Sequence, residues 1–205
     1  MTNQQPLASC HLLSPAGLWV SYKPLHSPRS QSAYVSSNNS RLVILGGYNR
    51  NYPGLVLPSL ETLSSLGDSQ VENVSLTSHV ASRFSSAVAL SDGSLVITGG
   101  VGREHQATLL LLSGETLQTE ALAPMREGRY RHSSVVIFQD SLEEVIIVAG
   151  GKSSVSRLIA SVERFSRRDN SWSFLQPLPT PRIDFTLQVT LIVSITYFKV
   201  ISLDF

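Results

Sequence analysis

Short apolar runs that end in paired glycines recur along the chain. They occupy residues 42–47, 95–100 and 145–151, and the pairs are Gly46-Gly47, Gly99-Gly100 and Gly150-Gly151. Each run is unbroken rather than alternating, which is typical of a strand buried on both faces. The second glycines are 53 and 51 residues apart, so the pattern predicts a structural repeat of about fifty residues.

A second marker follows the same period. Trp19 and Trp172 each begin the pattern Trp-x4-Pro-x3-Pro-Arg, and they lie 153 residues apart, which is three units of 51. Between them, Thr119 stands at the tryptophan position of one unit, and Arg83 is taken as the arginine of another. Two markers in one phase indicate about three complete units.

Polar turns divide each unit into four short strands, which we name a, b, c and d. The clearest unit has strand-like residues 85–90, a turn that contains Asp92-Gly93, and the apolar run that begins at Leu95. An Asp-Gly turn between two such runs favours a hairpin. Residues 107–112 and 116–122 supply the next two strands, so we expect an antiparallel meander.

The third unit resembles the kelch repeat, a β-propeller unit. The matching features are Pro124, Arg129, His132, Gly150-Gly151, Val162-Glu163-Arg164-Phe165 and Trp172. The resemblance implies an all-β fold, a partial kelch-type propeller with about three four-stranded blades, a strand from a preceding blade and a degenerate fourth. The expected organisation is an N-terminal segment at 1–16, kelch repeats at 17–182, and a divergent apolar tail at 183–205, read as one or two strands.

An open arc of blades leaves unpaired strand edges. We therefore expect further blades, or self-association, to close the ring. The resemblance also implies protein binding, because kelch blades serve as substrate receptors of ubiquitin ligases in some proteins and bind actin in others. The glycine pairs are interpreted as sharp structural turns rather than a phosphate site, since no helix follows to direct amides at an anion.

Composition and charge exclude several classes of partner. The formal net charge is +1, so there is no bulk electrostatic case for nucleic acid. The apolar tail is too short and interrupted for a transmembrane helix, and we expect no membrane partner. The single cysteine, Cys10, fits a reducing compartment and a cytoplasmic location. The alternative is an extracellular, galactose-oxidase-like kelch domain.

The charges are polarised along the repeat. In kelch propellers the d–a and b–c loops emerge on one face, and in this chain they hold most of the basic residues. We predict that this face binds an acidic segment of a partner protein, since arginine matches carboxylates with a planar fork of donors. The candidate contacts are Arg50, Arg103, Arg126, Arg129, Tyr130, Arg131 and Lys152. The alternative for an arginine in each d–a turn is a structural bond to backbone carbonyls.

The sequence favours a non-enzymatic protein without a cofactor or metal. The histidines His11, His26, His79, His105 and His132 are scattered and show no paired ligand spacing. His132 is interpreted as a core or turn residue, and Cys10 as a small apolar filler. No phosphate-binding glycine loop of the nucleotide-binding type and no Cys-x-x-Cys pair occurs.

Overall fold

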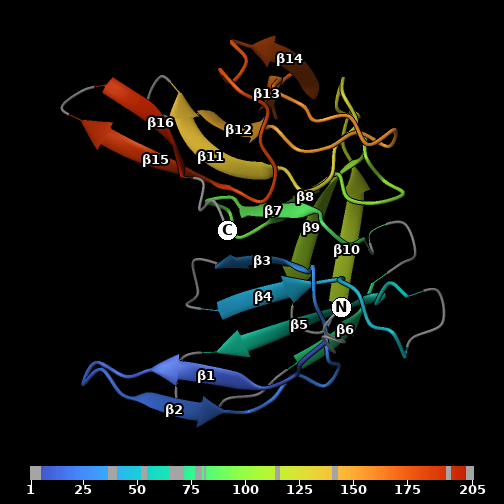
Figure 1. Cartoon of the computed structure of the whole chain (residues 1–205), viewed down its shortest axis with the longest axis vertical. Coiled ribbons are helices and arrows are strands. Elements are labelled where there is room, and N and C mark those ends of the chain that lie inside the picture. The colour runs from blue at the N-terminus through green and yellow to red at the C-terminus, as the bar shows by residue number, and fades with distance from the viewer. Residues whose placement is uncertain are drawn as a thin grey trace. The chain divides into compact units, whose positions relative to one another are not determined.

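A computed structural model of the chain consists of strands and loops over the residues that it describes (Figure 1). These residues are 6–36, 41–51, 55–64, 72–76, 80, 82–113, 116–139, 143–192 and 195–201. Within these ranges there is no helix, and so none that is long and apolar enough to cross a membrane. The all-β fold class expected from the sequence is confirmed.

In the described part of the chain, three antiparallel sheets contain four strands each, and every sheet follows chain order. This is the meander of a propeller blade. Blade 1 consists of β3 (Ala33–Ser36), β4 (Arg41–Leu45), β5 (Ser59–Ser64) and β6 (Glu72–Ser75). Blade 2 consists of β7 (Ser86–Ala89), β8 (Leu95–Thr98), β9 (Ala107–Ser113) and β10 (Thr116–Ala121). Blade 3 consists of β11 (Ser133–Gln139), β12 (Glu143–Ala149), β13 (Val162–Ser166) and β14 (Ser171–Leu175).

Two further sheets have two strands each. One pairs β1 (Cys10–Leu13) with β2 (Trp19–Tyr22), and the other pairs β15 (Thr186–Ile192) with β16 (Ile195–Ile201). The sequence predicted only the second strand of the first sheet, because β1 falls in the segment set apart at 1–16. The sequence predicted one or two strands in the apolar tail, and the tail forms two.

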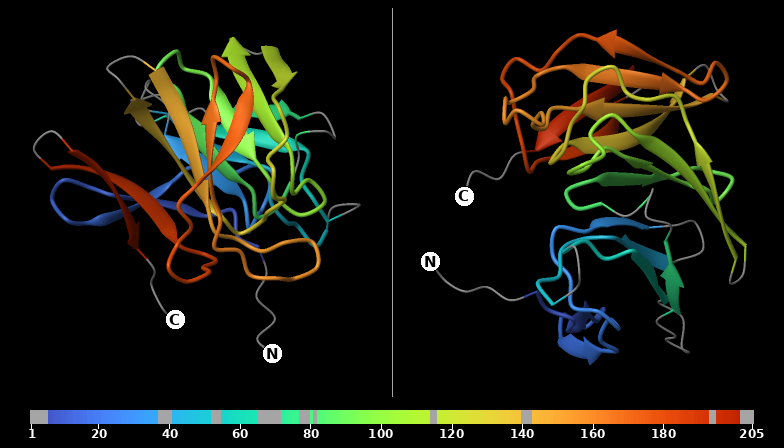
Figure 2. Two further views of the ribbon diagram at one scale, coloured as in Figure 1. Left: turned by 90° about the horizontal axis from the view of Figure 1, so that it is seen from above. Right: turned by 90° about the vertical axis from the view of Figure 1, so that its right-hand side faces the viewer.

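The chain divides into two compact units, Met1–Arg83 and Phe84–Phe205. Unit 1 holds β1–β2 and blade 1, and unit 2 holds blades 2 and 3 with β15–β16. Within unit 2 the sheets of blades 2 and 3 pack against each other, as Figures 1 and 2 show.

The b strands lie at the centre of the core of unit 2. All four residues of β8 are buried, as are the last five residues of β12, which confirms burial on both faces. Between blades 2 and 3 the core includes Val96, Leu109, Met125, Phe165 and Trp172, each no more than 4% exposed. A smaller cluster, which includes Ile147 of β12 and Phe185 before β15, repeats this packing one blade later.

The glycine pair at the end of each b strand is a structural turn. At Gly150, with φ +62°, an added Cβ would lie 2.7 Å from the carbonyl oxygen of Arg182, so a larger residue would clash. The amide of Gly151 donates to the same oxygen over 2.7 Å. Only a backbone without Cβ combines this positive φ with such a close approach. The glycine pair thus ties one blade to the turn that begins the next.

This tie corrects one residue of the predicted repeat phase. The second glycine of a pair donates to the carbonyl oxygen of Ser82, Arg129 or Arg182. In each case the residue two positions later, which is Phe84, Arg131 or Asp184, has a positive φ. Ser82 therefore occupies the arginine position of blade 2. The assignment of Arg83 to that position is wrong by one residue, because sequence spacing alone could not fix the register of the turn.

Candidate interaction surface

The d–a and b–c loops of unit 2 are joined by backbone hydrogen bonds. The amide of Arg129 donates to the carbonyl oxygen of Glu104 over 2.8 Å, and the amide of Met125 donates to the carbonyl oxygen of His105 over 2.7 Å. Tyr130 and Lys152 exchange two backbone bonds of 3.0 and 2.8 Å. We call residues 99–106, 122–132, 150–161 and 176–185 the unit 2 loop surface. The pattern of bonds shows that these loops form one connected layer.

Arg129 does not belong to the exposed part of this surface. Its side chain is fully buried and ion-paired with the buried carboxylate of Glu163 over 2.7 Å. The guanidinium also donates to the carbonyl oxygens of Gly150 and Ser161, over 2.8 and 3.1 Å. The prediction of Arg129 as a partner contact is therefore wrong, because the repeat uses this arginine to hold its own backbone. The structural alternative stated for the turn arginines applies here.

Glu163 completes a small network of buried polar groups. Its two carboxylate oxygens accept the backbone amides of Arg126 and Glu127, over 2.8 and 3.0 Å. The carboxylate thus fixes the d–a turn, while the arginine fixes the glycine pair. Every bond involves a charged group, so each is stronger than a neutral hydrogen bond.

Blade 1 repeats the same arrangement. Arg29 pairs with the fully buried Glu61, and it donates to the carbonyl oxygens of Gly46 and Ser59 over 2.9 and 3.1 Å. Glu61 also accepts the backbone amides of the turn at His26 and Ser27. The signal in the sequence is the triplet Ser-x-Glu at the start of strand c, at 59–61 and 161–163, which lies outside the glycine and tryptophan markers of the repeat.

Blade 2 replaces all three polar members of the network together. Strand pairing places Gln106 at the serine position and Thr108 at the glutamate position, and Ser82 stands at the arginine position. Because both the arginine and the glutamate are replaced, blade 2 has no unpaired charge at these two positions. An unpaired buried charge would be far more costly than losing both.

The remaining candidates in unit 2 are exposed or half-buried. Arg126 is exposed, and its Nε donates to the carbonyl oxygen of Trp172 over 2.6 Å. Arg131 pairs with Asp184 and lies 4.8 Å above the ring of Phe84. These contacts hold each guanidinium in a defined position.

Arg103, Tyr130 and Lys152 are half-buried members of the same surface. Arg103 donates to the side chain of Gln106 over 3.1 Å, and the ring of Tyr130 lies 6.3 Å from that of Phe84. Arg50 is exposed and lies in the b–c loop of blade 1. It therefore belongs to unit 1 and is not part of the unit 2 loop surface.

The unit 2 loop surface carries an excess of positive charge. Besides the buried Arg129 it holds six basic and three acidic residues. Two of the acids are already paired, since Glu127 binds Arg157 and Asp184 binds Arg131. The basic residues are Arg103, Arg126, Arg131, Lys152, Arg157 and Arg182.

The opposite loops of unit 2 are occupied by contacts between blades. Arg167 pairs with Asp92 over 2.6 Å, and Glu144 accepts the amide of Ser91 over 2.7 Å. Partial burial would by itself raise the pKa of Asp92, but hydrogen bonds from Ser94 and Arg167 hold that pKa at about 2, below the ordinary 3.8. Charged groups thus link blade 2 to blade 3 on this side.

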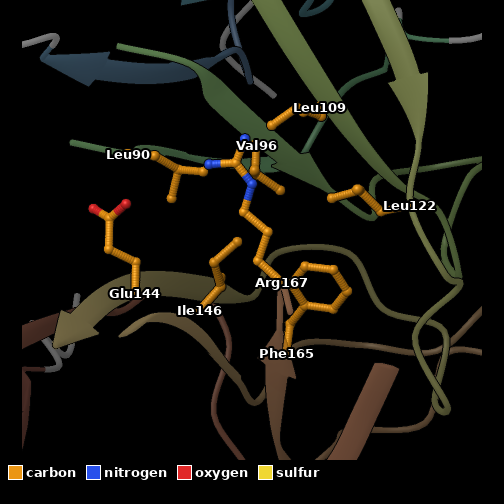
Figure 3. Close-up of a pocket in the computed structure, with 8 residues that line it drawn as sticks. All are labelled: Leu90, Val96, Leu109, Leu122, Glu144, Ile146, Phe165 and Arg167. Atoms are coloured by element: carbon orange, nitrogen blue, oxygen red, sulfur yellow. The ribbon is translucent and has the colours of Figure 1, made fainter. Parts of the chain in front are cut away.

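A small apolar pocket lies beside these contacts (Figure 3). Its walls include Leu90, Leu122 and Phe165, with Glu144 and Arg167 at its polar side. The cavity measures about 10 Å³, which is room for about one water molecule. The pocket is therefore an imperfection in the packing between blades rather than a ligand site.

Two histidines of unit 2 make structural contacts. His132 is buried and bonds Thr98 over 2.8 Å, and burial with the nearby charge of Arg129 lowers its pKa to about 3. His105 bonds the carbonyl oxygen of Met125 over 3.0 Å. His79 lies outside the described residues. In the part of the chain that the structure describes, no three His, Cys, Asp or Glu residues are grouped to hold a metal ion.

Comparison with known proteins agrees with the repeat geometry. Residues 141–179, which contain β12, β13 and β14, match the model of the kelch motif. The repeat is a kelch motif. The resemblance drawn from the sequence is therefore confirmed, and the match lies in blade 3.

A solved structure and a curated relative extend this result. The chain aligns with "Structure of YjhT" at a TM-score of 0.61 and 14% identity, over 82% of this chain and 52% of that one. This likeness shows a shared fold alone. Alpha-scruin of Limulus polyphemus is 28% identical over 104 residues, which cover 47% of this chain and 11% of the relative. The chain thus spans about a tenth of the length of alpha-scruin and about half of the solved structure.

Proposed function

We propose that this kelch chain is a non-catalytic module that binds a partner protein, and that the unit 2 loop surface receives an acidic segment of it. The observation that carries the proposal is the excess of basic over acidic residues on loops that hydrogen bonds join into one layer. Lys152 and Arg103 lie on neighbouring b–c loops, with the d–a loop of Arg126 between them. An extended acidic peptide would meet several cations in succession.

The fixed arginines favour specific rather than diffuse attraction. Arg126 is held by Trp172 and lies 6.0 Å from the ring of Phe174. A guanidinium already held in place loses less entropy when it binds a carboxylate. Tyr130 adds an aromatic contact beside these charges. Because such charges are near solvent, we expect affinity to fall as the salt concentration rises.

Matched charge reversals test this proposal. Lys152→Glu and Arg126→Glu act on the unit 2 loop surface, whereas Arg168→Glu makes the same change in the exposed c–d turn of blade 3. Binding of a fluorescent glutamate-rich peptide is measured by anisotropy at two salt concentrations. We expect Lys152→Glu and Arg126→Glu together to weaken binding by about tenfold or more, and Arg168→Glu by less than about threefold.

Two results would count against the proposal. Equal losses from all three reversals would show attraction to the net charge rather than to this surface. Unchanged affinity in the folded double variant would show that the peptide binds elsewhere. Circular dichroism of each variant provides the control for folding.

We also propose a cytoplasmic location, on the ground of the single cysteine. Cys10 is half-buried, and burial raises the pKa of its thiol, so it is a poor nucleophile.

Actin binding and substrate reception for a ubiquitin ligase are the two roles that kelch repeats suggest. Both would use a protein-binding surface of the kind described here.

A further inference from the structure

The two-stranded sheets are complementary halves of one blade. In β1–β2, Leu13 pairs with Trp19, as Phe165 pairs with Trp172 in strands c and d of blade 3. In the tail, β15 begins four residues after Arg182, as β11 begins four residues after Arg129. The sheet β1–β2 therefore corresponds to strands c and d, and β15–β16 to strands a and b.

Blade 3 shows what strands c and d contribute to a neighbouring blade. Trp172 is only 3% exposed, and its indole N–H donates to the carbonyl oxygen of Ala123 over 2.7 Å. The same cluster contains Leu122 and the buried Met125, from the end of β10 and the loop after it. The tryptophan of one blade thus covers the d–a loop of the preceding blade.

The equivalent surface at the end of blade 3 is uncovered. Its residues Leu175, Gln176 and Leu178 stand at the positions of Leu122, Ala123 and Met125. Leu175 is 38% exposed and Gln176 is also exposed, and Leu178 is half-buried where Met125 is 2% exposed. Unit 2 therefore has an exposed surface that matches the one covered by Trp172 and could bind a tryptophan.

The matching tryptophan is exposed in unit 1. Trp19 is 70% exposed, and beside it Leu13 and Leu18 are 57% and 66% exposed. Scattered apolar residues on a surface need no explanation, but a group of large apolar side chains on one small sheet indicates an interaction site. Two-stranded sheets are also barely stable by themselves, so both halves gain from a partner.

We propose that the chain binds a second copy of itself head to tail, and that β1–β2 of one copy completes the blade begun by β15–β16 of the other. The strand β1 pairs with the edge of β16 that no described strand covers. Trp19 lies over Leu175, and its indole N–H donates to the carbonyl oxygen of Gln176. The second copy is the occupant because its β1–β2 sheet matches strands c and d in the repeat phase, and because the contact continues the packing already present between blades 2 and 3.

The two surfaces that join belong to different sheets of the chain, so the contact is heterologous and can repeat from copy to copy.

One position of the composite blade departs from the repeat. The buried pair of Arg129 and Glu163 has its equivalents in Arg182 and His11, with Ser9 at the place of Ser161. A neutral imidazole accepts one hydrogen bond from a guanidinium but supplies no charge. The composite blade is therefore held less firmly than blade 3, and a glutamate at position 11 would restore the complete pair.

Complementary variants test the contact. The mass of the 205-residue chain is measured by light scattering and analytical ultracentrifugation over a range of concentrations. We expect the wild-type chain to associate, and Trp19→Glu and Leu175→Glu each to weaken association by about tenfold or more. Both residues are exposed, so neither change should unfold the chain. A mixture of the two variants should form a one-to-one dimer, because one intact contact remains.

The change His11→Glu gives the opposite expectation. It should tighten association by about threefold or more, and Arg182→Gln should remove that gain. A chain that stays monomeric at all concentrations would overturn the proposal. So would association that Trp19→Glu and Leu175→Glu leave unchanged, or a mixture of the two that remains monomeric. The peptide-binding test uses other residues, so each proposal can fail without the other.

Discussion

Arg129 and Glu163 show how a single pair of residues organises a kelch blade. Removing two charges from water is costly, and the cost is offset by their mutual attraction and by hydrogen bonds. The arginine donates to the glycine pair and to strand c, and the glutamate accepts two amides of the d–a turn. The pair thus connects strand b, strand c and the turn before strand a in one place.

A double-mutant cycle tests this role. Arg129→Ser and Glu163→Thr introduce residues that blade 2 has at these positions, and each should lower the free energy of unfolding by about 3–5 kcal/mol, because an unpaired charge remains buried. The double variant should lose less than the sum by about 1 kcal/mol or more. Urea denaturation followed by circular dichroism measures these values. Strictly additive losses of unfolding free energy would contradict an interaction between Arg129 and Glu163. The control is Arg168→Ser, which lies in an exposed turn.

The sequence indicated the repeat position of Arg129 but not its burial. A proline with an arginine five residues later is equally compatible with a solvated basic turn and with a buried arginine that binds the backbone. The difference lies in Glu163, which is some thirty residues away and meets the arginine only through the pairing of strands b and c. The Ser-x-Glu triplet was visible in two units, but spacing alone does not state which residue it faces. The half-buried positions of Lys152 and Arg103 likewise follow from the loop geometry.

The strands themselves were largely predictable. The glycine pairs and Asp-Gly turn predicted strands a and b of blade 2, and both appear close to the expected residues. Strands c and d of blades 1 and 2 lack the late tryptophan, yet they form, because backbone pairing with strand b continues without it. The strand β1 was missed, because its four residues carry neither a glycine pair nor a turn marker.

Trp19 and Trp172 allow a matched comparison of two elements. They occupy the same position of strand d, but one is 70% exposed and the other 3%. Trp172→Ala should lower the free energy of unfolding by about 3–5 kcal/mol, because it leaves a cavity and an unbonded carbonyl group. Trp19→Ala should change it by less than about 0.5 kcal/mol. Urea denaturation at a protein concentration too low for association measures both, and similar losses would contradict the difference in packing.

At the scale of the whole molecule, the sequence predicted a partial propeller of three blades with unpaired ends. The blade count and the resemblance to the kelch repeat are confirmed. The complementarity of the ends was not visible, because it depends on the register of β1 with β2 and on the exposure of Trp19. These are properties of packing between blades, and a period in the sequence does not report them.

Hydrogen exchange at two protein concentrations tests how the ends behave. At low concentration, amides of β1 and β16 should exchange much faster than those of β12, because two-stranded sheets open readily while β12 is paired on both edges. When the chains associate, β1 and β16 should become protected together, since each supplies the edge that the other lacks. The variant Trp19→Glu should lose this gain in protection at the same concentration, with β12 unchanged as the internal control. Protection that rises in only one of the two strands, or in neither while the mass doubles, would place the contact elsewhere, because a composite blade requires both edges to pair at once.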